Sequence, residues 1–247
     1  MGPARRPWPG PRADPRLSIG DTDLSRRTGR RCVSGRLAQF NPPLADAPAE
    51  WQPGWNISPG QQLLILRRNQ RQLECVRVLW KLTPGWMREL DKAPFSVRAE
   101  LLLDKPQFSQ PLAQRRCLLP VDGYYLWQQR GSRKQPWYLR RQNGGLAIAG
   151  LWERYQLEDG QYWDSCALIS VPAKGLAQQL GTRMPATLNS GEQAIWLAQA
   201  TAVSALQPLL LNAASQVELM HPVHPAMSNP QLQGPTCCAP SGRSLKL

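Results

Sequence analysis

The sequence contains no apolar run that approaches the roughly 20 residues required by a transmembrane helix. It has six cysteines but no Cys-x-x-Cys pair, and it has no hydrophobic secretory leader. These absences argue against a membrane-spanning helix and against a disulfide framework. We therefore expect a cytoplasmic protein whose thiols are reduced.

Histidine is scarce, since the chain has only His221 and His224. They stand three residues apart in "HPVHP", where the prolines forbid a helix and no third ligand is close in the sequence. We expect them to be structural, and we predict no metal site and no cofactor.

Acidic residues are few relative to basic ones: 17 Asp and Glu oppose 30 Lys and Arg, for a net charge of +13. Such a charge favours an anionic partner such as nucleic acid. The 247 residues are 42% hydrophobic, which is enough for one compact domain with its own core.

Residues 1–33 contain almost no periodic hydrophobicity and are rich in arginine and proline, so we predict a disordered basic extension. It could be an arm that binds nucleic acid. A transit peptide is less consistent with Asp14, Asp21 and Asp23. The interpretation we favour is a mis-assigned start, with translation beginning at Val33.

From residue 34 onward the pattern is that of an α+β domain. Alternating or continuous apolar runs at 61–68 and 73–82, separated by "NQRQ", predict a hairpin. Further strand-like runs occupy 115–127, 135–141, 144–155 and 165–171.

Two helices interrupt the strands, a weak one at 173–180 and a long one at 190–211. For the long helix the sequence predicts Ser190 as N-cap and Gln193 at N3. The segment after His221 should run as an extended, partly packed strap that frays over 241–247.

Ten short motifs carry a family resemblance in register: "SGRLAQF", "WNISPGQQLLIL", "WKLTPGW", "SVRAE", "DKPQF", "RRCLLPVDGYYLW", "KQPWYL", "AGLWERY", "GTRMP" and "HPVHPAMSNPQLQGP". Over residues 34–240 the chain resembles the SOS response-associated peptidase (SRAP) family of abasic-site processing proteins. The resemblance implies a single, monomeric SRAP-like domain. Its expected fold is a mixed or antiparallel barrel-like sheet with flanking helices.

Members of that family begin Met-Cys-Gly-Arg, and their cysteine becomes the mature N-terminus. In the family, its amine and thiol attack the aldehyde of an abasic sugar in single-stranded DNA and close a thiazolidine, and both groups are nucleophilic near neutral pH. An asparagine, a glutamate and a histidine assist.

This sequence departs from the family at each of those four catalytic positions. The positions fall on Ser34, Ser96, Leu126 and Gly181. A hydroxyl is a weaker nucleophile than a thiolate, leucine cannot move a proton, and glycine has no side chain. The resemblance therefore implies a protein of the SOS response whose thiazolidine cross-linking is lost.

The DNA-binding positions of the family are better matched. The resemblance implies phosphate-contacting arginines, a fixed turn, a base-stacking tryptophan and a small hydroxyl near the lesion. These positions are Arg36, Arg98 and Arg183; Asn56, Pro59 and Gly60; Trp86; and Ser170. Guanidinium groups neutralise phosphates, and an aromatic face stacks on bases of any sequence.

We therefore expect a nucleoid-associated protein that binds single-stranded DNA, including DNA with abasic sites. Two alternatives stay open. The free amine of Ser34 could retain lyase activity if the chain begins there, or the domain could be a decayed interaction module without a DNA role.

Overall fold

The computed structural model describes residues 36–39, 51–52, 54–69 and 72–246, with only the backbone of Arg36. The chain divides into two units, residues 1–32 and 33–247. The predicted disordered extension, residues 1–33, lies outside the described residues, as does Ser34.

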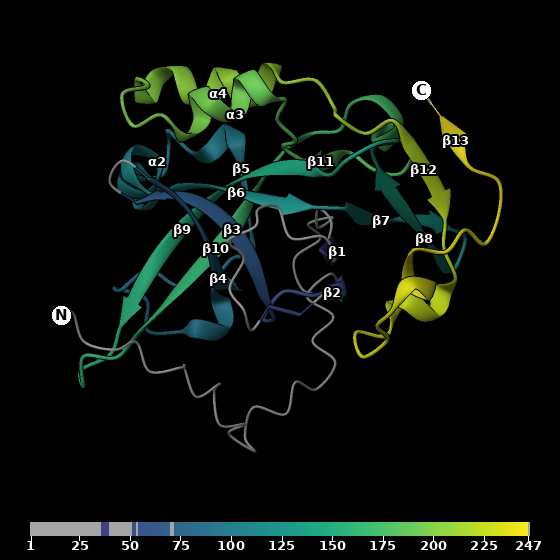
Figure 1. Ribbon diagram of the computed structural model, residues 1–247, viewed down its shortest axis with the longest axis horizontal. Helices are drawn as coiled ribbons and strands as arrows, with labels where there is room; N and C mark the ends of the chain where they lie inside the picture. Colours follow the sequence, from purple (N-terminus) through teal and green to yellow (C-terminus); the bar gives the residue numbers. More distant parts are fainter. Residues whose placement is uncertain (1–35, 40–50, 53, 70–71, 247) are drawn as a thin grey trace. The chain divides into compact units, whose positions relative to one another are not determined.

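The centre of the second unit is a closed, five-stranded mixed barrel (Figure 1). Its strands run in the order β10-β4-β3-β6-β9, and β9 pairs with β10 to close it. Among the five barrel strands, only β4 and β10 pair in parallel. The bounds are β3 Gln62–Asn69, β4 Gln72–Trp80, β6 Arg116–Val121, β9 Leu146–Gln156 and β10 Tyr162–Pro172. The predicted α+β fold and barrel-like sheet are confirmed, and β3–β4 is the predicted hairpin.

A second, antiparallel sheet has the order β13-β12-β8-β7-β1-β2. Its strands are β1 Arg36–Gln39, β2 Gly54–Ile57, β7 Gly123–Arg130, β8 Arg133–Arg140, β12 Leu219–Pro222 and β13 Leu245–Lys246. The buried amide of Gln39 joins this sheet to the barrel, because it both donates to and accepts from the backbone of Leu64 in β3.

Three α-helices flank the sheets within the described residues: α2 Ser109–Gln114, α3 Ser190–Leu197 and α4 Val203–Asn212. Figure 1 shows α3 and α4 together at the top of the molecule, and α3 contacts β6 while α4 contacts β10. Six 3-10 turns connect the elements: η1 Leu90–Lys92, η2 Ala99–Leu101, η3 Pro106–Phe108, η4 Gly175–Gln179, η5 Pro225–Ser228 and η6 Pro235–Cys238. The weak helix predicted at 173–180 is thus only the turn η4.

The predicted long helix at 190–211 is wrong in two respects. Its N-cap is Asn189, whose side chain accepts from the backbone N–H of Glu192, so the capping box lies one residue earlier than predicted. The helix also breaks after Leu197 into α3 and α4.

Buried Arg116 explains the break. Its Nε donates to the carbonyl of Trp196 (2.6 Å) and its Nη2 to that of Ala198 (2.7 Å), so these acceptors are not left for a continuing helix. Its Nη1 meanwhile binds carbonyls at the end of α2. The guanidinium is stabilised there by carbonyl dipoles, because helix C-termini are partially negative.

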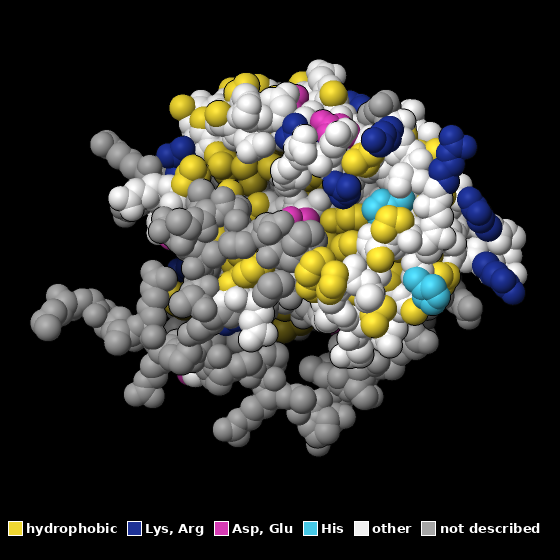
Figure 2. Space-filling model, turned by 45° about the vertical axis from the view of Figure 1, so that its right-hand side comes forward, with side chains coloured by type: hydrophobic (Ala, Val, Ile, Leu, Met, Phe, Trp, Pro, Cys, Tyr) yellow, Lys and Arg dark blue, Asp and Glu magenta, His cyan; other side chains and the backbone are white. Residues whose placement is uncertain are grey.

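The C-terminal segment, for which the sequence predicts a strap that frays over 241–247, includes strand β13 at Leu245–Lys246. Met220 pairs with Leu245 in strand β13, and Leu245 packs against the main core, which holds the end of the strap. Figure 2 shows both histidines on the face formed by this region, with Lys and Arg side chains along its right-hand edge. His221 is buried and bonds the carbonyl of Cys238 through Nε2 at 2.8 Å.

The described part of the chain contains no group of three or more His, Cys, Asp or Glu side chains placed to hold a metal ion. No helix in the same residues is long and apolar enough to span a bilayer.

Candidate nucleic-acid interface

Three strands bring four of the predicted site residues together at one end of β10. Strand β5 (Ser96–Arg98) lies parallel to β10, and β11 (Arg183–Pro185) lies antiparallel to it. The register puts Arg98 beside Ser170 and Arg183 beside Pro172. Residues separated by more than 80 positions in the sequence therefore meet at this end of the strand.

Arg183 reaches across this end of β10 and forms a bidentate ion pair with Glu100. Its Nη1 and Nη2 lie 2.7 and 2.8 Å from the two carboxylate oxygens. Nη2 also donates to the carbonyl of Ser170 (2.7 Å), and Nε donates to the Ser170 hydroxyl (3.3 Å). Ser170, which β5 and β11 flank, is almost fully buried. The bond from Arg183 is the main reason that the pKa of Glu100 lies below its ordinary value.

Arg98 behaves differently from Arg183. It is exposed, and its side chain makes no hydrogen bond or ion pair with any described residue. Side chains alternate along a strand, so Val97 points into the core while Ser96 and Arg98 share the outer face. Arg98 thus presents its guanidinium to solvent beside the hydrogen-bonded group of Arg183, Glu100 and Ser170.

Gly181 and Leu126 lie on neighbouring elements. Gly181 closes the turn after η4, where its N–H donates to Ala177, and a Cβ added to it would meet nothing within 4 Å. Leu126 in β7 is 6% exposed and belongs to the main core. Two residues further along the same face of β7, Gln128 donates to the carbonyl of Gln179 in η4 (3.3 Å), so the two elements touch.

The turn between β2 and β3 carries Pro59 and Gly60. Gly60 has a φ of +91°, which favours glycine, and its N–H donates to the carbonyl of Trp80 (2.9 Å). Trp80 in turn donates from its indole to Phe95, the residue before Ser96. This turn is therefore connected to β5 through one buried tryptophan.

Asn56 is fully buried, and its amide nitrogen donates to the carbonyls of Met227, Asn229 and Leu232. These bonds hold strand β2 to the C-terminal strap. Asn56 can therefore affect a ligand only by positioning the turn that follows it.

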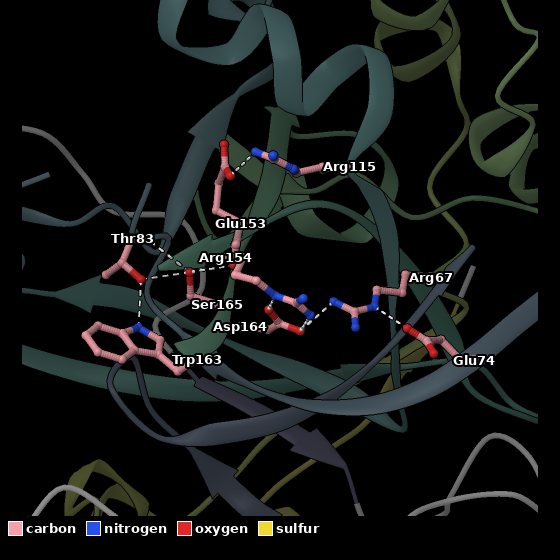
Figure 3. Close-up of polar contacts among 9 residues, drawn as sticks. All are labelled: Arg67, Glu74, Thr83, Arg115, Glu153, Arg154, Trp163, Asp164 and Ser165. Carbon is pink, nitrogen blue, oxygen red and sulfur yellow. Dashed lines mark hydrogen bonds and ion pairs between the residues drawn. The ribbon is translucent and has the colours of Figure 1, made fainter. Parts of the chain in front are cut away.

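Trp86 is 62% exposed and lies in a turn closed by a bond from Met87 N–H to the Pro84 carbonyl (2.9 Å). Figure 3 shows what holds the start of this loop. The backbone and hydroxyl of Thr83 both bond the buried hydroxyl of Ser165 at 2.9 Å, and the Trp163 indole donates to Thr83 Oγ1. An ordered anchor thus presents the exposed indole.

A chain of charges lies beside that anchor (Figure 3). Arg67 binds Glu74 and Asp164 at 2.6 and 2.7 Å, and Asp164 also binds Arg154 at 2.8 Å. Burial alone would raise the pKa of Asp164, but the bonds from Arg154 and Arg67 outweigh it and hold the pKa below its ordinary value.

The loop that carries Trp86 is anchored at Ser165, and Arg98 and Arg183 meet at Ser170. These two serines are five residues apart on β10, which at about 3.3 Å per residue is roughly 17 Å. The structure thus brings together Ser96, Arg98, Ser170 and Arg183, whereas Trp86 lies in the loop that follows Thr83, which is bonded to Ser165 further along β10. For Arg36 it gives only the backbone, which pairs with Tyr125 in β7, next to Leu126.

Sequence reasoning missed Glu100 as a site residue. Its signal was present in "SVRAE", where a carboxylate follows Arg98 by two residues. That it pairs with Arg183 rather than with Arg98 depends on the contact between distant strands.

Comparisons with known proteins agree with this architecture. The profile of the family described as SOS response associated peptidase (SRAP) matches residues 25–230. The Bacillus subtilis abasic site processing protein YoqW is 28% identical over 165 residues, which are 65% of this chain and 74% of YoqW. The mouse abasic site processing protein HMCES is 26% identical over 263 aligned residues, covering 89% of this chain and 71% of HMCES.

Among solved structures, a crystal structure of a protein from Bacteroides thetaiotaomicron superposes with a TM-score of 0.68. It is 20% identical, and the match covers 78% of this chain and 88% of that one. At this identity the likeness concerns the fold.

Proposed function

The chain belongs to the SOS response associated peptidase (SRAP) family, and from that premise we propose that it binds single-stranded DNA at abasic sites. The observation that carries the proposal is Arg98 on β5, an exposed guanidinium that forms no hydrogen bond or ion pair with a described residue, at the end of β10 that Arg183 reaches from β11. Phosphate is the natural partner of such a group. The exposed Trp86 offers a stacking surface for an unpaired base.

We further propose that covalent capture of the abasic sugar is lost. Leu126 is buried among apolar side chains and can neither donate nor accept a proton. Gly181 leaves open space where the family has a histidine, and Ser96 stands in place of its asparagine. The proposal thus describes a DNA-binding pseudoenzyme of the DNA damage response.

Arg98→Ala is expected to weaken binding to a single-stranded oligonucleotide. It should also flatten the slope of log affinity against log salt concentration by up to about 0.7, the value for one lost phosphate contact. Arg36→Ala and Arg183→Ala should act in the same direction. Fluorescence anisotropy titrations at several salt concentrations measure both quantities. Arg243→Ala, which removes an exposed arginine near β13, is the charge-matched control and should leave the slope unchanged. A triple Arg36, Arg98 and Arg183 variant that binds like the parent would refute the proposal.

Mixed with an oligonucleotide containing an abasic site, the protein is expected to give no adduct that survives heating in denaturant. An oxazolidine formed by a serine reverses, whereas a thiazolidine formed by a cysteine is stable. A denaturing gel measures the adduct, and the same mixture treated with borohydride detects an imine. A heat-stable adduct in good yield would contradict the pseudoenzyme proposal, and a borohydride-trapped band would instead favour a residual lyase.

A further inference from the structure

The guanidinium of Arg183 is almost fully engaged within the protein. An arginine has five N–H donors. Two of them meet the carboxylate oxygens of Glu100, and Nε and Nη2 also donate to Ser170. A phosphate that binds arginine in the same bidentate manner needs the edge that Glu100 occupies.

We propose that Glu100 competes with DNA phosphate for the guanidinium of Arg183. The carboxylate pairs with Arg183 in the free protein and leaves it when a DNA strand binds. The inference rests on the proposed DNA-binding function and adds a regulatory residue to the same site. Glu100 belongs to none of the positions that the family resemblance assigns to catalysis or DNA contact.

The charges support competition over simple positioning. A closed Arg183–Glu100 pair is neutral, so it offers an approaching phosphate no net attraction, and its carboxylate repels the phosphate at short range. Arg98, which forms no hydrogen bond or ion pair with a described residue although its charge also lowers the pKa of Glu100, then provides the net positive charge of these three side chains. When the pair opens, two guanidinium groups face the same strand of DNA.

The two side chains also differ in their freedom to move. The Arg183 side chain is only 12% exposed and is held at Ser170, whereas the Glu100 side chain is 39% exposed. Glu100 also sits in the short turn η2 rather than inside the barrel. Opening therefore requires the carboxylate to rotate into solvent while the guanidinium stays hydrogen-bonded to Ser170 of β10, which leaves the guanidinium edge that faced Glu100 free for a phosphate.

The test compares Glu100→Gln with the parent in anisotropy titrations with a single-stranded oligonucleotide. Because the Glu100 carboxylate no longer has to be displaced from Arg183, we expect about tenfold tighter binding at low salt. The slope of log affinity against log salt concentration should stay close to that of the parent, because Arg183 meets the same phosphate in both complexes. In an Arg183→Ala background, the gain in affinity should be lost.

Glu218→Gln is the matched control, because Glu218 is also a partly exposed, arginine-paired glutamate but lies before β12. It should change neither affinity nor slope appreciably. Glu100→Ser is the second variant and should act like Glu100→Gln, since it also removes the carboxylate. Thermal unfolding of each variant checks that the domain is folded.

The outcomes separate this inference from the proposed function. If the parent binds single-stranded DNA and neither Glu100 variant binds more tightly than the Glu218 control, the competitor role is wrong and the DNA-binding role stands. If the parent and both Glu100 variants all fail to bind, both proposals are overturned.

Discussion

Covalent capture of an abasic oligonucleotide is expected once the four family catalytic side chains are restored in a chain that begins at residue 34. The four substitutions are Ser34→Cys, Ser96→Asn, Leu126→Glu and Gly181→His. The parent should give no stable adduct, so the expected change is from none to a band that persists on a denaturing gel. The strand would already be held by Arg98 and its neighbours, and positioning supplies much of the rate of such reactions.

The structure indicates how each described position would accept its new side chain. A histidine at 181 has open space for its Cβ, and Ser96 is only partly buried at the outer face of β5. The site of Leu126 is apolar, so a glutamate there would have a raised pKa, as a proton donor near neutral pH requires. It would also cost stability, which a three-substitution variant retaining Leu126 measures.

The same four substitutions in the full 247-residue chain are the main control and should give no capture. There the nitrogen of residue 34 is a peptide amide, which is not a nucleophile. A repaired, shortened chain that folds and binds DNA but forms no adduct would show that the pocket has changed beyond these positions. The proposal would then keep only its binding part.

Asp164→Asn is expected to destabilise the domain by about 1.5–3 kcal/mol at neutral pH, because the charge-assisted hydrogen bonds from Arg67 and Arg154 are lost while Arg67 keeps its pair with Glu74. Asp164 bonds Arg67 and Arg154, and Arg67 is nearly buried. Urea unfolding followed by tryptophan fluorescence measures the change. Glu158→Gln, an exposed acidic residue in the turn between β9 and β10, is the charge-matched control and should change stability by less than about 0.5 kcal/mol.

The difference in unfolding free energy between the parent and Asp164→Asn should depend on pH in a definite direction. The folded pKa of Asp164 is lowered, so its contribution is fully present above the unfolded pKa of about 3.9. It is lost as the pH falls through the lower folded pKa. The difference between parent and variant should therefore be constant from pH 7 to about pH 5 and shrink below pH 4. A difference that does not shrink in acid would mean that packing, and not charge, is responsible.

The course of the strands followed largely from local sequence. The β3–β4 hairpin was evident from two alternating apolar runs and a polar turn, because side chains of a strand alternate between core and solvent. The helical segment after residue 190 was also recognisable, but its division into α3 and α4 was not. The division depends on Arg116, which lies more than 70 residues earlier and binds the carbonyls that end α3.

Sequence by itself determined the α+β class, the family and the identity of the side chains at the family's positions, because these follow from local pattern and from motifs in order. Only the tertiary structure decided which of them can act. It left Arg98 without a hydrogen bond or ion pair to any described residue, placed the buried Ser170 against the Arg183 guanidinium, and engaged Asn56 with the C-terminal strap. The physical reason is that the exposure and the pairing of a side chain depend on contacts between strands distant in sequence. A short sequence motif contains no information about such contacts.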